Sequence, residues 1–176
     1  MNDAAQTTLN WIHGFIVEYN ICPFAKRVLE QNGLAIDVVA VDQVEASLEA
    51  MMSAIFRLDD DKQVETILLV FPKLLQDFMA YLDFVELADR LLLEQGYEGI
   101  YQLATFHPDY CFEGVDPDDV SNYTNRSPYP MLHLLREDSV EKAIQFYGDT
   151  DKIPKNNIAL MHQLGLQKIK QILSST

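Results

Sequence analysis

Two hydrophobic periodicities alternate along the first hundred residues of the chain. Short runs of apolar and β-branched residues at Leu34–Val41, Thr66–Phe71 and Gly99–Phe106 predict buried strands. Between these runs, apolar residues recur every three or four positions, which predicts amphipathic helices. The predicted helices of this part are Thr7–Tyr19, Pro23–Gln31, one that begins after Asp42, and Leu74–Glu94.

A long stretch, Thr105–Glu137, interrupts this alternation. It holds four of the seven prolines, two of the four histidines and one of the two cysteines. Loops of this length in compact domains are usually functional or disordered, and the aromatic residues here argue against disorder. We therefore expect most of any active or binding site in this stretch. The helices predicted after it are Val140–Tyr147 and Asn156–Leu173.

Helices that alternate with buried strands predict an α/β layer fold. Because the connections suit right-handed crossovers, we expect a small, mostly parallel sheet of about three strands layered with helices. A long structured loop would follow the third strand and could add an edge strand. The length of 176 residues fits a single domain, 1–176. Sites in such sheets lie at the carboxyl ends of strands, and Phe106 is one such end.

Composition narrows the classes of partner. The net charge of −14 and the pI near 4.5 weigh against nucleic acid and against anionic membrane surfaces. The first residues, Met1–Thr8, lack the basic start of a secretory signal, and no apolar run is long enough to span a membrane. Cys22 and Cys111 are far apart, which favours a cytoplasmic protein with free thiols. A disulfide between them stays open.

Three residues are candidates for catalysis. Cys22 stands at a predicted helix start, where the helix dipole lowers the pKa of a thiol, although a buried cysteine also serves as a small apolar residue. His107 follows the third strand and precedes a proline that holds its backbone extended, so it is a general base or a hydrogen-bonded structural residue. His133 lies among leucines, as a polar group of the site or as a core histidine.

A second group of residues suggests an anion site. We expect substrate to be bound by Asn125, Arg126, Ser127, Tyr129 and Arg136. Ser127 and the proline after it predict a helix start, whose free N–H groups beside the guanidinium of Arg126 suit a carboxylate or phosphate. On that predicted helix, His133 and Arg136 share one face. Alternatively, Arg126 pairs with a loop aspartate and fixes the loop.

No cofactor is identified by a motif. The histidines and cysteines lack metal-ligand spacing, so no metal site is predicted. The chain also lacks the glycine-rich loops that bind phosphates and dinucleotides, the nucleophile elbow and the zinc-protease helix motif. The cofactor therefore stays unknown.

The segments N-I-C-P-F-A-K and F-H-P…N-R-S-P-Y-P-M-L-H-L-L-R-E resemble a bacterial family, domain of unknown function 1415. The likeness extends from about Trp11 to the last helix. It implies a bacterial cytosolic protein and supplies neither an activity nor a cofactor. Its signature segments contain Cys22, His107, Asn125, Arg126, Ser127, His133 and Arg136.

The leading functional hypothesis is a small cytosolic enzyme that acts on an anionic small molecule. His107 would be the acid/base, Arg126 and the helix turn after it the anion clamp, and Cys22 or His133 a second polar group. The reaction type is not indicated.

Two alternatives stay open. The first is a non-catalytic binding or regulatory module, in which residues 105–137 serve a protein partner or a second copy of the chain. The second is a thiol-redox protein, which needs Cys22 exposed and close to Cys111. A concave pocket favours the enzyme and a flat apolar patch favours the module. The oligomeric state is not indicated.

Overall fold

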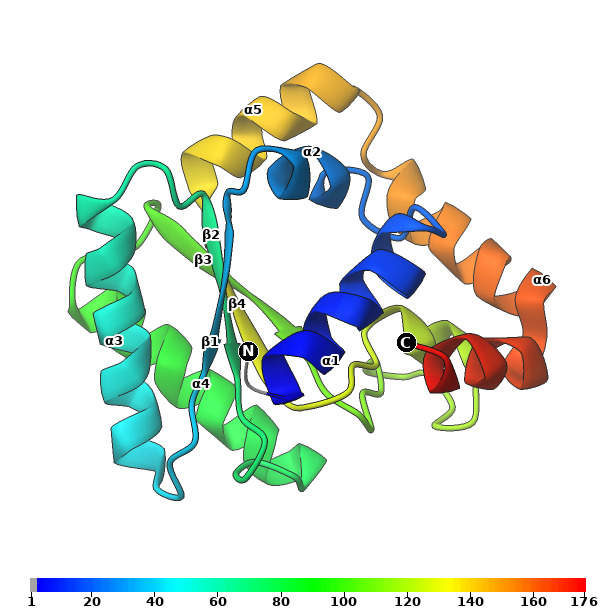
Figure 1. Cartoon of the computed structure of the whole chain (residues 1–176), viewed down its shortest axis with the longest axis horizontal. Coiled ribbons are helices and arrows are strands. Elements are labelled where there is room, and N and C mark those ends of the chain that lie inside the picture. The colour runs from blue at the N-terminus through cyan, green and yellow to red at the C-terminus, as the bar shows by residue number, and fades with distance from the viewer. Residues whose placement is uncertain (1–2) are drawn as a thin grey trace.

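The computed structural model describes residues 3–176 and has an α/β fold around a four-stranded sheet (Figure 1). The strands are β1 (Leu34–Val38), β2 (Thr66–Val70), β3 (Tyr101–Phe106) and β4 (Met131–Arg136). Their order in the sheet is β1-β2-β4-β3, with β1 parallel to β2, and β4 antiparallel to both β2 and β3. The expected mostly parallel sheet of about three strands is therefore wrong, because two of the three pairings are antiparallel.

Helices cover both faces of this sheet. They are α1 (Asp3–Trp11), continued by a π-helical segment (Ile12–Val17), then α2 (Ala25–Glu30), α3 (Val44–Asp60), α4 (Phe78–Glu94), α5 (Glu137–Tyr147) and α6 (Lys152–Ser174), with a 3-10 helix at Val120–Thr124. Figure 1 shows α3 and α4 on one face, α1, α2 and α6 on the other, and α5 running beside α2. In residues 3–176, no helix has the length and apolarity that crossing a bilayer requires.

Strand β4 corrects a prediction. Met131–Arg136 was expected to continue a helix, but it forms a strand in the middle of the sheet rather than at its edge. Leu132 and Leu134 enter the core under α3 and α4, whereas His133 faces the opposite side. A strand alternates its side chains in this way, so His133 does not share a helix face with Arg136. No helix begins at Ser127 either.

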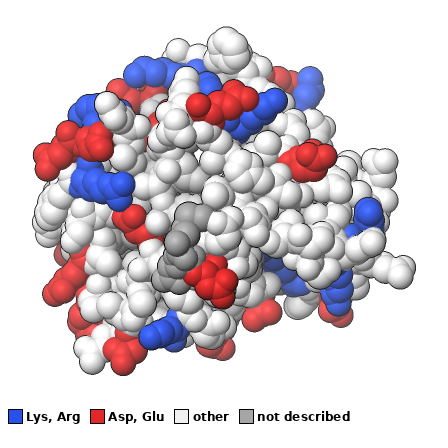
Figure 2. Space-filling view, viewed as in Figure 1, with Lys and Arg blue, Asp and Glu red and all other residues white. Residues whose placement is uncertain are grey.

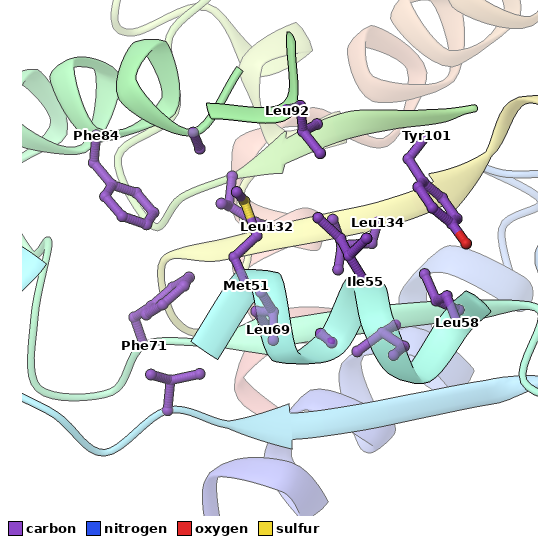
Figure 3. Packing of buried hydrophobic residues seen from close by; sticks show 14 of the residues in the cluster. Met51, Ile55, Leu58, Leu69, Phe71, Phe84, Leu92, Tyr101, Leu132 and Leu134 are labelled. Carbon is purple, nitrogen blue, oxygen red and sulfur yellow. The ribbon is translucent and has the colours of Figure 1, made fainter. Parts of the chain in front are cut away.

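The core on the α3–α4 face is built from alternate strand residues and one stripe of each helix. Figure 3 shows Met51, Ile55 and Leu58 of α3 directed at the sheet, and all three are completely buried. They pack in one cluster with Leu132 and Leu134 of β4. Each such side chain contributes roughly 1.5–3 kcal/mol through burial, so this half of the molecule is a closed, well-packed unit.

Tyr81 links α4 to the end of the sheet through hydrogen bonds of its hydroxyl. Its hydroxyl donates to the carbonyl oxygen of Met131 at 2.7 Å and accepts from the backbone N–H of Phe106 at 3.1 Å. Phe106 and Met131 are register partners, where β3 ends and β4 begins. The ring of Tyr81 is fully buried, so this bridge fixes where the chain leaves β3 for the long loop.

We predict that Tyr81→Phe lowers the free energy of unfolding by about 1–3 kcal/mol, because it leaves one buried acceptor and one buried donor without a partner. Urea unfolding at neutral pH measures this loss. Tyr97→Phe is the matched control, since its hydroxyl binds the carboxylate of Asp59 at 2.8 Å, which Tyr101 also contacts. Tyr97→Phe should lower the free energy of unfolding less than Tyr81→Phe does, and equal losses would contradict the bridging role of Tyr81.

Candidate functional site

A pocket of about 660 Å³ lies between the sheet and the helices α2 and α5. Neither helix has a single buried residue. Both nevertheless turn apolar side chains to the pocket, among them Val28 and Leu29 of α2 and Val140 and Ala143 of α5. The two helices therefore cover this part of the sheet with partly buried side chains only, of which Leu29 also packs against the core cluster around Leu68.

The floor of the pocket consists of alternate residues from all four strands. They are Leu34 of β1, Thr66 and Leu68 of β2, His133 and Leu135 of β4, and Gln102, Ala104 and Phe106 of β3. The residues between them, such as Ile67, Leu103 and Leu134, belong to the core under α3 and α4. Because side chains alternate along a strand, the same strands build a dense core on one face and the pocket floor on the other.

The π-helical segment supplies one wall. Trp11, Ile12, Ile16 and Ile21 line the pocket from this side. The backbone N–H of Ile21 donates to the carbonyl of Ile16 at 2.9 Å, five residues back. Turns of this wide type are frequent at functional sites. The indole N–H of Trp11 is, among residues 3–176, the one fully buried side-chain nitrogen or oxygen without a hydrogen-bond partner.

His133 is the titratable group on the pocket floor. Its Nε2 lies 2.7 Å from the hydroxyl oxygen of Thr66, and that hydroxyl donates its only hydrogen to the carbonyl of Leu134. Nε2 must therefore carry the imidazole proton and donate to Thr66. In this tautomer Nδ1 holds a lone pair, and none of residues 3–176 hydrogen-bonds to it.

Burial keeps the imidazole ring of His133 uncharged at neutral pH. Burial lowers its pKa from the ordinary 6.5 to about 4, because a low-dielectric setting disfavours the imidazolium. At neutral pH the pocket floor thus presents a neutral acceptor, Nδ1, within an apolar surface. A negative charge placed near this ring would raise its pKa.

Cys22 lines the same pocket as His133. Burial raises the pKa of its thiol, and the backbone N–H groups of Phe24 and Ala25 only partly oppose this. This direction of the pKa shift is opposite to the one expected from a helix start, because burial outweighs those N–H groups. The helix α2 itself begins at Ala25 rather than at the proline after Cys22. Cys22 and Cys111 are both free thiols, so no disulfide joins them.

His107 lies outside the pocket lining and is completely buried. Its Nε2 donates to the carbonyl of Leu75 at 3.0 Å, and its Nδ1 accepts from the backbone N–H of Asp109 at 2.9 Å. Leu75 has a positive φ of 64°, uncommon for this residue type. Burial lowers the pKa of His107. Both ring nitrogens are engaged with backbone, so the geometry favours a structural role, and the acid/base role stays a prediction.

Arg126 holds the long loop together. Its guanidinium donates to the carbonyls of Tyr110 at 3.1 Å and Pro117 at 2.9 Å, and it lies 4.5 Å from the ring centre of Tyr123. Its hydrogen-bond partners are thus carbonyls rather than the aspartates expected as an alternative. Because no helix begins at Ser127, the expected anion clamp lacks its helix N-terminus.

The remaining substrate-binding candidates divide between the pocket and the loop. Asn125 lines the pocket and donates its side-chain amide to the carbonyl of Thr105 at 3.1 Å. Arg136 lines the rim, where it donates to backbone carbonyls and to the hydroxyl of Tyr101. Ser127 donates its hydroxyl to the carbonyl of Tyr129, and neither residue belongs to the lining.

The structure thus brings together half of the sequence candidates and adds others. The pocket contains Cys22, Asn125, His133 and Arg136. Trp11, Thr66 and Arg27 also line it, and none of the three is among the site residues predicted from the sequence. The one usable signal in the sequence is the alternation along β2 and β4, because each strand has a polar residue on the face that lines the pocket. Within residues 3–176, no three His, Cys, Asp or Glu side chains are grouped to hold a metal ion.

We predict that His133 makes the protein acid-sensitive. A histidine whose folded pKa lies below its unfolded value of 6.5 stabilises the fold above that value, and this contribution is lost as the pH falls toward about 4. His133→Gln should therefore lose less stability than wild type between about pH 7 and pH 4.5, by up to about 3 kcal/mol. Urea unfolding across this range measures it. The exposed His13→Gln is the control, and parallel curves for His133→Gln and wild type would contradict the assignment.

We also predict that Ala104→Leu is neutral or stabilising, by up to about 1 kcal/mol, because the larger side chain enters the pocket. Ala88→Leu is the matched control, since Ala88 is completely buried in the α3–α4 core. That change should cost about 1–3 kcal/mol through overpacking. Thermal unfolding compares the two variants, and an equal loss in both would show that the sheet face is already filled.

Comparison with known proteins supplies a family. No curated protein and no solved structure matches the chain. The family model described as "Protein of unknown function (DUF1415)" matches residues 3–171. This match covers nearly the whole chain, and both signature segments noted in the sequence lie within it. The chain therefore belongs to the DUF1415 family.

Proposed function

We propose that the protein binds a small, largely apolar molecule in the pocket between the sheet and the helices α2 and α5. The observation that carries this proposal is that both covering helices lack buried residues while a space of about 660 Å³ separates them from the sheet. Small-molecule sites typically span about 300–1,000 Å³ and combine apolar walls with a few polar groups. The pocket has this size and this composition.

His133 gives the site a preference among ligands. Its Nδ1 is an unprotonated acceptor at neutral pH, because Nε2 is engaged with Thr66. A ligand with a hydroxyl or N–H group at this point would form a neutral hydrogen bond, which contributes about 0.5–1.5 kcal/mol. A purely apolar ligand of the same shape would leave this acceptor without a partner.

The enzyme expected from the sequence is the second candidate function. Cys22, Asn125 and His133 line one pocket, and this observation favours catalysis there rather than at His107. A bound anionic substrate would raise the pKa of His133 and make it a stronger base. A thiol-redox role receives less support, because burial raises the pKa of Cys22. A bacterial source and a cytoplasmic location stay predictions.

A matched pair of ligands tests the binding proposal. Trp11, the single tryptophan of the chain, lies in the pocket wall, so its intrinsic fluorescence reports whether a ligand occupies the pocket. Wild type should bind 1-naphthol about five- to tenfold more tightly than 1-methylnaphthalene, because only the hydroxyl can donate to His133. His133→Leu should remove this preference, and the exposed His13→Leu should keep it.

Ala104→Leu provides the second arm, because it narrows the pocket floor without changing a polar group. It should lower the binding affinity for both ligands by about tenfold or more, because the added side chain occupies the volume that the ligands need. If neither ligand binds wild type saturably, or if Ala104→Leu binds both as well as wild type, the pocket is not the binding site.

A further inference from the structure

A second, polar cavity of about 680 Å³ adjoins the apolar pocket. The two share four lining residues, which therefore form the junction between them: Arg27, Glu65, Arg136 and Ser139. On one side of this junction lie the aliphatic residues of α2, α5 and the sheet. On the other side the walls are mainly charged and polar. A molecule that fills both cavities must therefore be amphipathic.

The charges around the polar cavity favour an anionic group. Its lining includes four cationic side chains, Arg27, Lys62, Arg136 and Lys142, and three carboxylates, Asp59, Glu65 and Asp138. In a chain with a net charge of −14, such an excess of cations is a local exception. Figure 2 shows Lys and Arg side chains, mixed with acidic ones, over the part of the surface where α2 and α5 lie.

The two arginines of the junction differ in how firmly they are held. Arg136 donates to the carbonyls of Leu58 and Val64 and to a tyrosine hydroxyl, so its guanidinium is fixed and no carboxylate contacts it directly in the described residues. Arg27 instead pairs with Glu65 at 2.9 Å, and its side chain is 56% exposed. Ion pairs this exposed are weak, so a ligand anion can readily replace Glu65 beside Arg27.

We propose that the ligand is an anionic amphiphile with a single apolar chain, which rests on the proposed function of the pocket. The chain lies between the sheet and the helices α2 and α5, in contact with the residues of the floor such as Leu68 and Ala104. The anionic head lies at the junction, where Arg27 binds it and the fixed charge of Arg136 attracts it. There the head can stay hydrated while the chain is buried.

Decanoate and 1-decanol test this proposal as a matched pair, each below the concentration at which it aggregates. Titration monitored through Trp11 should show decanoate binding about tenfold more tightly, because a charge-assisted hydrogen bond to Arg27 is stronger than a neutral one. Affinity should rise about fourfold for each methylene from octanoate to dodecanoate, as expected when the chain is buried.

Arg27→Ala and Arg57→Ala separate the junction from general charge effects. Arg57 is the matched control, since it pairs with Asp37 at 3.0 Å with 46% of its side chain exposed, and it lines neither cavity. Arg27→Ala should lower the binding affinity for decanoate about tenfold and leave the affinity for 1-decanol unchanged. Arg57→Ala should change neither.

The outcomes distinguish this inference from the proposal on which it rests. If decanoate and 1-decanol bind with equal affinity, or if Arg27→Ala and Arg57→Ala have the same effect, the proposal of an anionic head group is wrong. The proposal that the apolar pocket binds a ligand is then unaffected. If 1-naphthol binds and decanoate does not, the inference is likewise overturned. If none of these molecules perturbs Trp11, the proposed function fails as well.

Discussion

The alternation of side chains along β4 is the constraint on which the rest of the structure depends. Leu132 and Leu134 enter the core under α3 and α4, while His133 and Leu135 face the pocket. A shift of one residue would exchange these sets and place an imidazole in the core under α3 and α4. The register with β2 and β3, together with the bond from His133 to Thr66, holds β4 in place. The alternation along β4 thus divides its side chains between the core under α3 and α4 and the face that carries the pocket.

On the opposite face, the helices α2 and α5 have no buried residue and contact one another at their ends. Phe24, just before α2, contacts Tyr147 at the end of α5 edge-on, with 5.7 Å between ring centres. Arg27 of α2 reaches Glu65 at the start of β2. Segments with few buried apolar contacts are those whose local opening costs least free energy. A ligand that fills the pocket would supply the apolar contacts that α2 and α5 lack, so binding and closure of this cover should reinforce one another.

Much of the fold could be predicted from local pattern. The strands β1, β2 and β3 and the helices α3 and α4 appear near their predicted places, because each has a clear period and clear ends. Met131–Arg136 was misassigned because a short apolar run preceded by prolines fits a helix start as well as a buried strand. The misassignment then misplaced Ser127 as a helix cap. The pocket itself could not be predicted, since it arises from tertiary spacing between α2, α5 and the sheet, which periodicity does not encode.

Nuclear Overhauser effects between bound decanoate and the protein can establish whether the ligand lies in the space between the sheet and the helices α2 and α5. A ligand in this space should show contacts from its chain protons to the methyl groups of Ala104 and Leu68 on the pocket floor. Phe146 of α5 offers the contrasting site, because its side chain is 95% exposed. Contacts confined to Phe146 and other exposed residues would contradict binding in this space.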